Sequence, residues 1–101
     1  MPTALTASAV EAALESIPGW QLEPTRPSIH RTFRFTNFST AWAFMSRCAL
    51  EAERINHHPE WSNVWATVDV TLTTHDCDGL SQLDLDLAAF MNHAAAPLLA
   101  P

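Results

Sequence analysis

The sequence of 101 residues contains no lysine, and its five basic residues are all arginine, against eleven acidic residues. The formal net charge is therefore −6. Direct binding to the phosphate backbone of a nucleic acid requires a basic patch, so we expect no direct contact with nucleic acid. The sequence also lacks an apolar run long enough to cross a bilayer, and it lacks the basic and then apolar start of a signal peptide. These absences predict a cytoplasmic protein without a membrane segment.

Glycine and cysteine are scarce too, with two residues of each. So few glycines leave little room for flexible or low-complexity segments, and no repeat or linker is visible. Cys48 and Cys77 are too few and too far apart for a disulfide framework or a Cys-x-x-Cys motif. Since 101 residues suffice for one hydrophobic core, we predict a single domain over residues 1–101.

Three segments have apolar residues three and four positions apart, which predicts amphipathic helices. A side chain that can cap the first turn precedes each segment. The predicted caps are Thr6 for the first helix, Asn37 or Ser39 for the second and longest, and Ser81 for the third. Asp84 lies in the capping-box position of the third helix. Pro18-Gly19 should end the first helix, and Pro97 should end the third.

Four shorter segments are predicted strands, three because apolar and polar residues alternate in them and the one after Pro59 as a short extended piece. They span residues 20–23, 29–35, 60–64 and 66–73. The last segment is the clearest, because its even-numbered residues are apolar and its odd-numbered residues are polar, as in a sheet covered on one face. The element order helix, strand, strand, helix, strand, strand, helix predicts an α+β fold. We expect a four-stranded antiparallel sheet with three helices packed on one face.

Three of the five histidines lie in one stretch of the sequence that begins near the end of the second helix. His58 precedes Pro59, which biases it towards an extended backbone just past that helix. Neighbouring residues in an extended chain point to opposite sides, so either His57 or His58 can face a cleft. If the helix continues to His57, Glu53 lies one turn before it and can contact it. His75 follows at the end of the last strand.

This cluster allows three kinds of site. A metal site would combine the three histidines with Cys77, but adjacent histidines match no common zinc spacing. A nucleophilic Cys77 would need an activating cation or a helix N-terminus, and the sequence shows neither. Metal-free acid–base catalysis needs only histidines, whose ordinary pKa of about 6.5 lets them give and take protons near neutrality. A structural or solvent-exposed role stays open for each histidine, and we favour it for His30 and His93.

The spacing of these residues is specific. The sequence reads Glu53-x-x-x-His57-His58-Pro59, then five residues and Trp65, nine more and His75, and later Asp84. This pattern resembles the signature of the pterin-4a-carbinolamine dehydratases. Pro18-Gly19-Trp20 and residues 31–35 resemble the same family, so the resemblance covers nearly the whole chain.

The resemblance implies an enzyme that removes water from 4a-hydroxytetrahydropterin to give quinonoid dihydropterin. Because the histidines lack a metal-ligand spacing and a dehydration needs only proton transfers, we expect no metal or other cofactor. It implies that His57 and His75 are the acid–base pair and that His58 binds and orients the pterin. Glu53 would set the protonation or position of His57. The other substrate-binding residues that the resemblance implies are Pro59, Thr74, Asp76, Cys77, Trp20 and Trp61.

The resemblance also implies a biological setting. Members of the family recycle the pterin cofactor of aromatic amino acid hydroxylases, and they are typically tetramers built as dimers of dimers. Some also stabilise the dimer of a homeodomain transcription factor. The expected partners are therefore the pterin substrate and further copies of the chain, in a dimer or tetramer. A protein-interaction module and a pterin-binding protein without turnover stay open as other functions.

Overall fold

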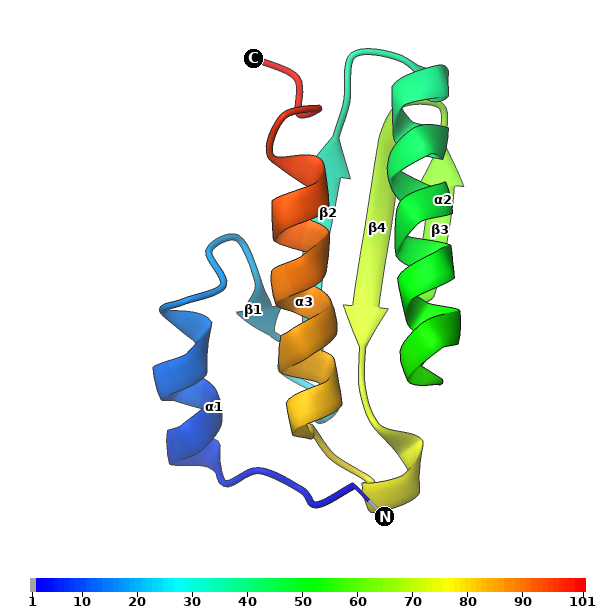
Figure 1. Ribbon diagram of the computed structural model, residues 1–101. Helices are drawn as coiled ribbons and strands as arrows, with labels where there is room; N and C mark the ends of the chain where they lie inside the picture. The colour runs from blue at the N-terminus through cyan, green and yellow to red at the C-terminus, as the bar shows by residue number, and fades with distance from the viewer. Residues whose placement is uncertain (1) are drawn as a thin grey trace.

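A four-stranded antiparallel sheet, with the strand order β1-β2-β4-β3, forms one layer of the protein (Figure 1). The computed structural model describes residues 2–101. The strands are β1 (Gln21–Leu22), β2 (Ile29–Arg34), β3 (Glu60–Val64) and β4 (Thr67–Leu72). The second layer consists of the helices α1 (Ala7–Leu14), α2 (Phe38–Ile55) and α3 (Gln82–Ala95). A short 3-10 helix, η1 (His75–Cys77), follows β4.

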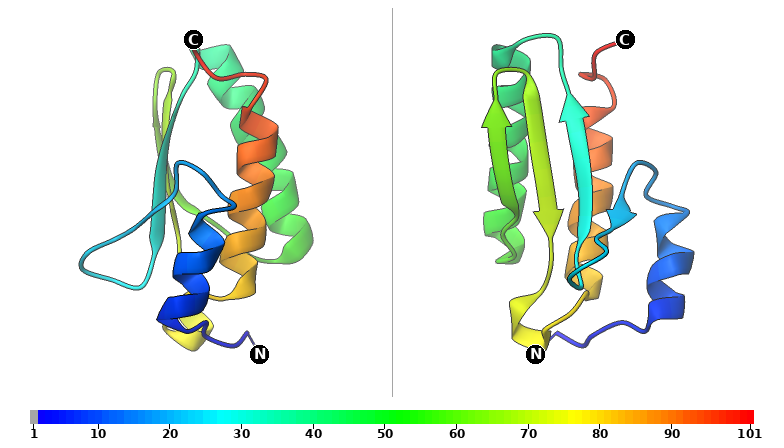
Figure 2. Two further views of the ribbon diagram at one scale, coloured as in Figure 1. Left: turned by 90° about the vertical axis from the view of Figure 1, so that its left-hand side faces the viewer. Right: turned by 180° about the vertical axis from the view of Figure 1, so that it is seen from behind.

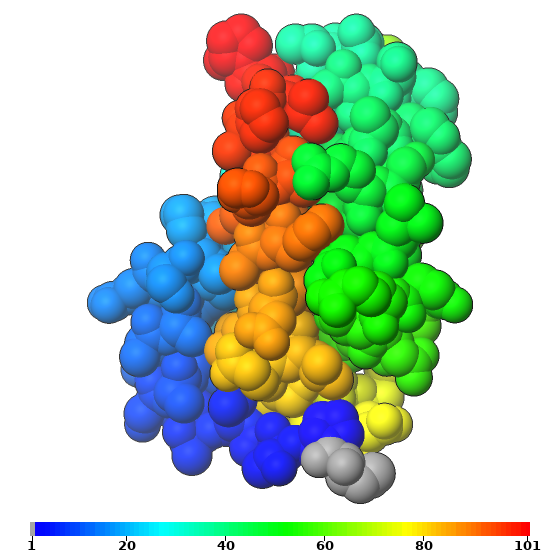
Figure 3. Space-filling model, viewed as in Figure 1, coloured from blue at the N-terminus to red at the C-terminus, as the bar shows by residue number. Residues whose placement is uncertain are grey.

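All three helices lie on one face of the sheet, which confirms the predicted α+β architecture (Figure 2). Val68, Val70 and Leu72 of β4 are fully buried beneath the helices, while the residues between them lie on the open face of the sheet. Burial of this apolar row drives the layers together. Helices α2 and α3 pack side by side over the sheet (Figure 3). Among residues 2–101, no helix combines the length and the apolar character that crossing a membrane requires.

Aromatic rings fill much of the space between the two layers. Phe33 of β2 and Phe44 of α2 have ring centroids 4.8 Å apart, and Trp20 meets Phe33 edge-on at 5.9 Å. The indole N–H of Trp20 donates a hydrogen bond to Oδ1 of Asn92, at 2.8 Å. Since a buried indole nitrogen needs such a partner, this contact fixes the segment before β1 against α3.

The helices begin where the sequence predicts. Thr6 and Asn37 each accept a backbone N–H of the first turn through the side-chain oxygen, so Asn37 rather than Ser39 caps α2. The carboxylate of Asp84 accepts the backbone N–H of Ser81 at 2.9 Å, as expected for a capping box.

Next to the histidines, the ends of one helix and one strand differ from the sequence prediction. Helix α2 ends at Ile55 and does not continue to His57, because Asn56 adopts a left-handed conformation with φ 53°. Strand β4 ends at Leu72, so His75 begins η1 instead of ending the strand.

Candidate active site

The three clustered histidines come together at one end of the sheet, where the chain leaves α2 and where it leaves β4 (Figure 1). The left-handed turn at Asn56 directs His57 and His58 away from the helix axis. The turn η1 carries His75 to the same place. The histidines line a hollow of about 200 Å³ together with Pro2, Asn56, Thr73, Thr74, Asp76 and Leu83.

His57 is the most enclosed of the three histidines, and its partner is Asp84. Its Nε2 lies 2.6 Å from Oδ1 of Asp84, and the two side chains are 9% and 0% exposed. The other carboxylate oxygen accepts hydrogen bonds from the Thr74 hydroxyl at 2.6 Å and from the Ser81 N–H at 2.9 Å. Because a carboxylate accepts hydrogen bonds, we assign the proton of neutral His57 to Nε2. The Nδ1 atom of the neutral ring then carries no proton.

His58 contacts Glu53 through Nε2 and Oε1, which are 2.9 Å apart, and both side chains are exposed. The expected contact between Glu53 and His57 is therefore wrong. The reason is the early end of α2, since only a helix continuing to His57 would place these two residues one turn apart. Glu53 instead reaches the histidine that follows.

His75 has a carboxylate partner of its own. Its Nε2 lies 3.1 Å from Oε2 of Glu60, and both oxygens of Glu60 accept hydrogen bonds from Arg26, at 2.9 and 3.1 Å. The hydrogen bonds from Arg26, together with a smaller effect of His75, hold the pKa of Glu60 below its usual value. Each of the three histidines thus has one carboxylate partner, and each partner comes from a different part of the chain.

Among the other residues that the resemblance implied, Thr74 and Asp76 line the hollow, but Pro59, Cys77, Trp20 and Trp61 do not. Trp20 lies in the core, because burying its large ring against Phe33 removes more apolar surface from water than a place at the rim would. Trp61 is opposite Val70 and packs against the core from β3. The Cys77 thiol donates to the carbonyl of Thr74, at 3.6 Å.

Sequence reasoning missed three residues of this arrangement. Asp84 was expected only as a helix cap and as the last residue of the signature, not as the partner of a histidine. The sequence feature that could have indicated this role is an acidic residue at the start of a helix near the histidine segment. Glu60 and Arg26 had no signal, because their pairing joins positions 34 residues apart.

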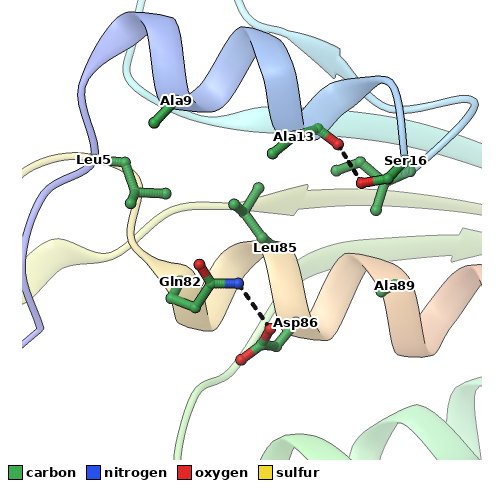
Figure 4. Close-up of a pocket in the computed structure, with 9 residues that line it drawn as sticks. Leu5, Ala9, Ala13, Ser16, Gln82, Leu85, Asp86 and Ala89 are labelled. Atoms are coloured by element: carbon green, nitrogen blue, oxygen red, sulfur yellow. Dashed lines mark hydrogen bonds between the residues drawn. The ribbon is translucent and has the colours of Figure 1, made fainter.

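A second hollow, between α1 and α3, offers no comparable chemistry (Figure 4). Its walls are mostly alanine, leucine and isoleucine side chains. Asp86 is its only titratable residue, and Gln82 donates a hydrogen bond to it at 2.9 Å.

Burial raises the pKa of Cys48, in the core, to about 12, so this thiol has little nucleophilic character. In residues 2–101, no three His, Cys, Asp or Glu side chains converge as metal ligands would.

The fold and the site are those of an α+β protein with a histidine cluster at one end of its sheet, and comparison with known proteins gives the family. The sequence model of the pterin 4 alpha carbinolamine dehydratase family matches residues 3–94. A relative from Sinorhizobium fredii (strain NBRC 101917 / NGR234) that carries the family's name is 53% identical over 95 residues, which are 94% of this chain and 90% of the relative. A relative of the same name from Bordetella avium (strain 197N) is 54% identical over 84 residues, 83% of this chain and 78% of the relative.

A solved structure is similar to the chain in both fold and sequence. The crystal structure of a transcriptional coactivator/pterin dehydratase from Brucella melitensis matches with a TM-score of 0.90 and 46% identity. The match covers 92% of this chain and 99% of that one. The chain belongs to the pterin-4a-carbinolamine dehydratase family. The predicted family is confirmed, and with it the prediction of an enzyme of the hydro-lyase class.

Proposed function

We propose that the protein dehydrates a 4a-hydroxytetrahydropterin to quinonoid dihydropterin and water, with His57 and His75 as the acid–base pair. One observation carries the proposal: in a chain of this family, three histidines with carboxylate partners line a single hollow. Histidine is suited to the task because it exchanges protons near neutral pH.

The reaction needs two proton transfers. One histidine takes the proton from N5 of the pterin, and the other delivers a proton to the 4a-hydroxyl, which leaves as water while the C4a–N5 double bond forms. No electron is gained or lost, so the reaction needs no redox cofactor, and because both steps are proton transfers that histidines can make, it needs no metal. His57 and His75 reach the hollow from the end of α2 and from η1, which allows approach to the substrate from two sides.

The other residues around the hollow would bind and orient the pterin. His58 contacts Glu53, a carboxylate that no arginine among residues 2–101 holds in the way that Arg26 holds Glu60, so a role in binding suits it better than a role that needs a fixed proton. Thr74 holds Asp84 with its hydroxyl, which also lies 2.7 Å from the hydroxyl of Ser81. The wall of the hollow beside His75 is thereby tied to the start of α3. Asp76 lines the hollow next to His75.

As part of the same proposal, the enzyme recycles the pterin cofactor of aromatic amino acid hydroxylases in the cytoplasm. Quinonoid dihydropterin must be reduced before it can serve again, so a reductase would consume the product. The direct test is turnover of enzymatically generated 4a-hydroxytetrahydropterin by the purified protein, followed against the slow spontaneous dehydration. Tight binding of the pterin without any acceleration would favour a pterin-binding protein instead.

We also propose that the chain forms a dimer or tetramer. Phe38 and Trp42 are exposed on α2 with their rings stacked at 6.4 Å, and Val64 and Trp65 are exposed at the end of the edge strand β3. Exposed apolar side chains and an open strand edge are typical of surfaces that other chains cover. Light scattering at assay concentration that gives the mass of a single chain would contradict this proposal.

The exposed face of α2 also supports a second candidate function, that of a protein-interaction module. The Brucella melitensis structure is described as a transcriptional coactivator as well as a pterin dehydratase. Recovery of a protein partner by the purified chain, together with failure to accelerate dehydration, would favour this function over the enzyme.

A further inference from the structure

Arg26, Glu60 and His75 form a connected group although they come from three separate segments. Arg26 lies in the loop between β1 and β2, Glu60 is the first residue of β3, and His75 is the first residue of η1. Arg26 donates two hydrogen bonds to the Glu60 carboxylate, at 2.9 and 3.1 Å, and Oε2 of Glu60 lies 3.1 Å from Nε2 of His75.

His75 needs such a partner more than His57 does. Its side chain is 78% exposed, and it stands on a 3-10 turn of three residues, so packing alone does not fix its ring. A general acid or base must stay within hydrogen-bond reach of the proton it transfers. Among residues 2–101 the ring has one polar contact, with Glu60, and this contact therefore decides the orientation of the ring.

Glu60 is well placed to supply that orientation. Its backbone is held in the sheet, opposite Thr71 of β4. A bidentate arginine contact fixes the plane of a carboxylate, which a single bond does not. Arg26 also keeps the pKa of Glu60 below its usual value, so the carboxylate stays available as an acceptor in acidic solution.

We propose that Glu60, held by Arg26, is the positioning residue of His75. By accepting a hydrogen bond from Nε2–H, Glu60 fixes the tautomer of the neutral ring and leaves Nδ1 as the atom that exchanges a proton with the substrate. The role deepens the proposed function and rests on it. It parallels the role of Asp84 towards His57, with an exposed pair in place of a buried one.

The charged and titratable groups around His75 are few. Glu60 faces it from β3, Arg26 stands behind Glu60, Asp76 is its neighbour in η1, and His57 and His58 share the hollow. Glu60 is the only one of them within hydrogen-bond distance of the ring among the described residues. Replacing Glu60 therefore removes the one contact that distinguishes the two ring nitrogens.

The test compares the tautomer of His75 with turnover in matched variants. Nitrogen-15 NMR of histidine-labelled protein at mildly alkaline pH, with the His75→Ala spectrum for assignment, should show the Nε2–H form in the wild type. Glu60→Gln should give a mixture of tautomers, because an amide can either donate or accept. It should lower kcat about 10–100-fold, the range found when a partner that orients a metal-bound histidine is removed. Glu60→Asp should recover part of the rate, and Arg26→Gln should act in the same direction as Glu60→Gln.

Glu51→Gln is the matched control, because Glu51 likewise accepts two hydrogen bonds from an arginine, Arg54, at 2.8 and 2.7 Å, and within residues 2–101 it has no hydrogen bond to a histidine. It should change neither the tautomer nor kcat. An unchanged His75 tautomer in Glu60→Gln would overturn the proposal, whether or not turnover falls. The spectrum requires no turnover, so it is separate from the proposed function, which fails if His75→Ala retains the wild-type kcat.

Discussion

Replacing Asp84 with asparagine should impair both folding and catalysis, because the carboxylate accepts three hydrogen bonds while fully buried. The amide has one acceptor oxygen, so either the Nε2–H of His57 or the donors of Thr74 and Ser81 then lose their acceptor. An unsatisfied buried donor destabilises a protein by about 1–3 kcal/mol. Where the amide N–H faces His57, the ring regains a partner at Nε2 only in the tautomer with the proton on Nδ1. Turnover should then lose most of what His57 contributes, on the order of 10²–10⁴-fold in kcat.

The assay measures urea unfolding and steady-state turnover of Asp84→Asn beside Asp86→Asn. Asp86 lies on the same helix but is exposed, and its one hydrogen-bond partner in the described part of the chain is Gln82, so its variant should match the wild type in both measurements. The loss of kcat in Asp84→Asn should persist at temperatures where the variant is fully folded. A folded Asp84→Asn protein with wild-type kcat and wild-type stability would refute the argument that this carboxylate fixes His57.

Three other predictions concern backbone strain, acid stability and metal dependence. Gly19→Ala should lower the free energy of unfolding by about 1–3 kcal/mol, because Gly19 has φ +89° and a Cβ there would lie 2.7 Å from Nε of Arg31. An unchanged urea midpoint would contradict this prediction. The lowered pKa of Glu60 means that its ion pair with Arg26 stabilises the fold above the ordinary pKa of glutamate and that this contribution is lost as the pH falls through the lowered value. Between pH 6 and pH 3, roughly the range around the ordinary pKa of glutamate, the urea midpoint of Glu60→Gln should therefore fall less than that of the wild type. An equal fall in both proteins would contradict a stabilising contribution from the ion pair. Treatment with a chelator should leave turnover unchanged, since dehydration needs only proton transfers; activity that is lost and restored specifically by zinc would refute this.

The architecture was predictable because it depends on local patterns. The alternation around Val68 and Val70 identifies a strand with one buried face, and the side chains of Thr6 and Asn37 mark where helices begin. Each of these signals lies within a few residues of the feature that it predicts. The sheet layer and the face that carries the helices follow from them.

The partners of the histidines were harder to predict, because they depend on where a helix stops and on contacts across the fold. The left-handed turn of Asn56 moves His57 off α2, so it contacts Asp84, 27 residues further along the chain, instead of Glu53. Nothing near Glu60 in the sequence indicates that an arginine from another loop holds it. The histidine positions were therefore readable from the sequence, whereas the residues that orient them required the fold.

The central claim, that His57 and His75 act together as acid and base, is tested most directly by kcat in the variants His57→Ala, His75→Ala and the double variant. Each single substitution should lower kcat on the order of 10²–10⁴-fold with little change in KM. The double variant should lose less than the product of the single losses, because groups that act as one unit are not additive. His58→Ala should mainly raise KM. If His57→Ala and His75→Ala both retain a kcat near that of the wild type and only bind the pterin more weakly, acid–base catalysis by these two residues is contradicted.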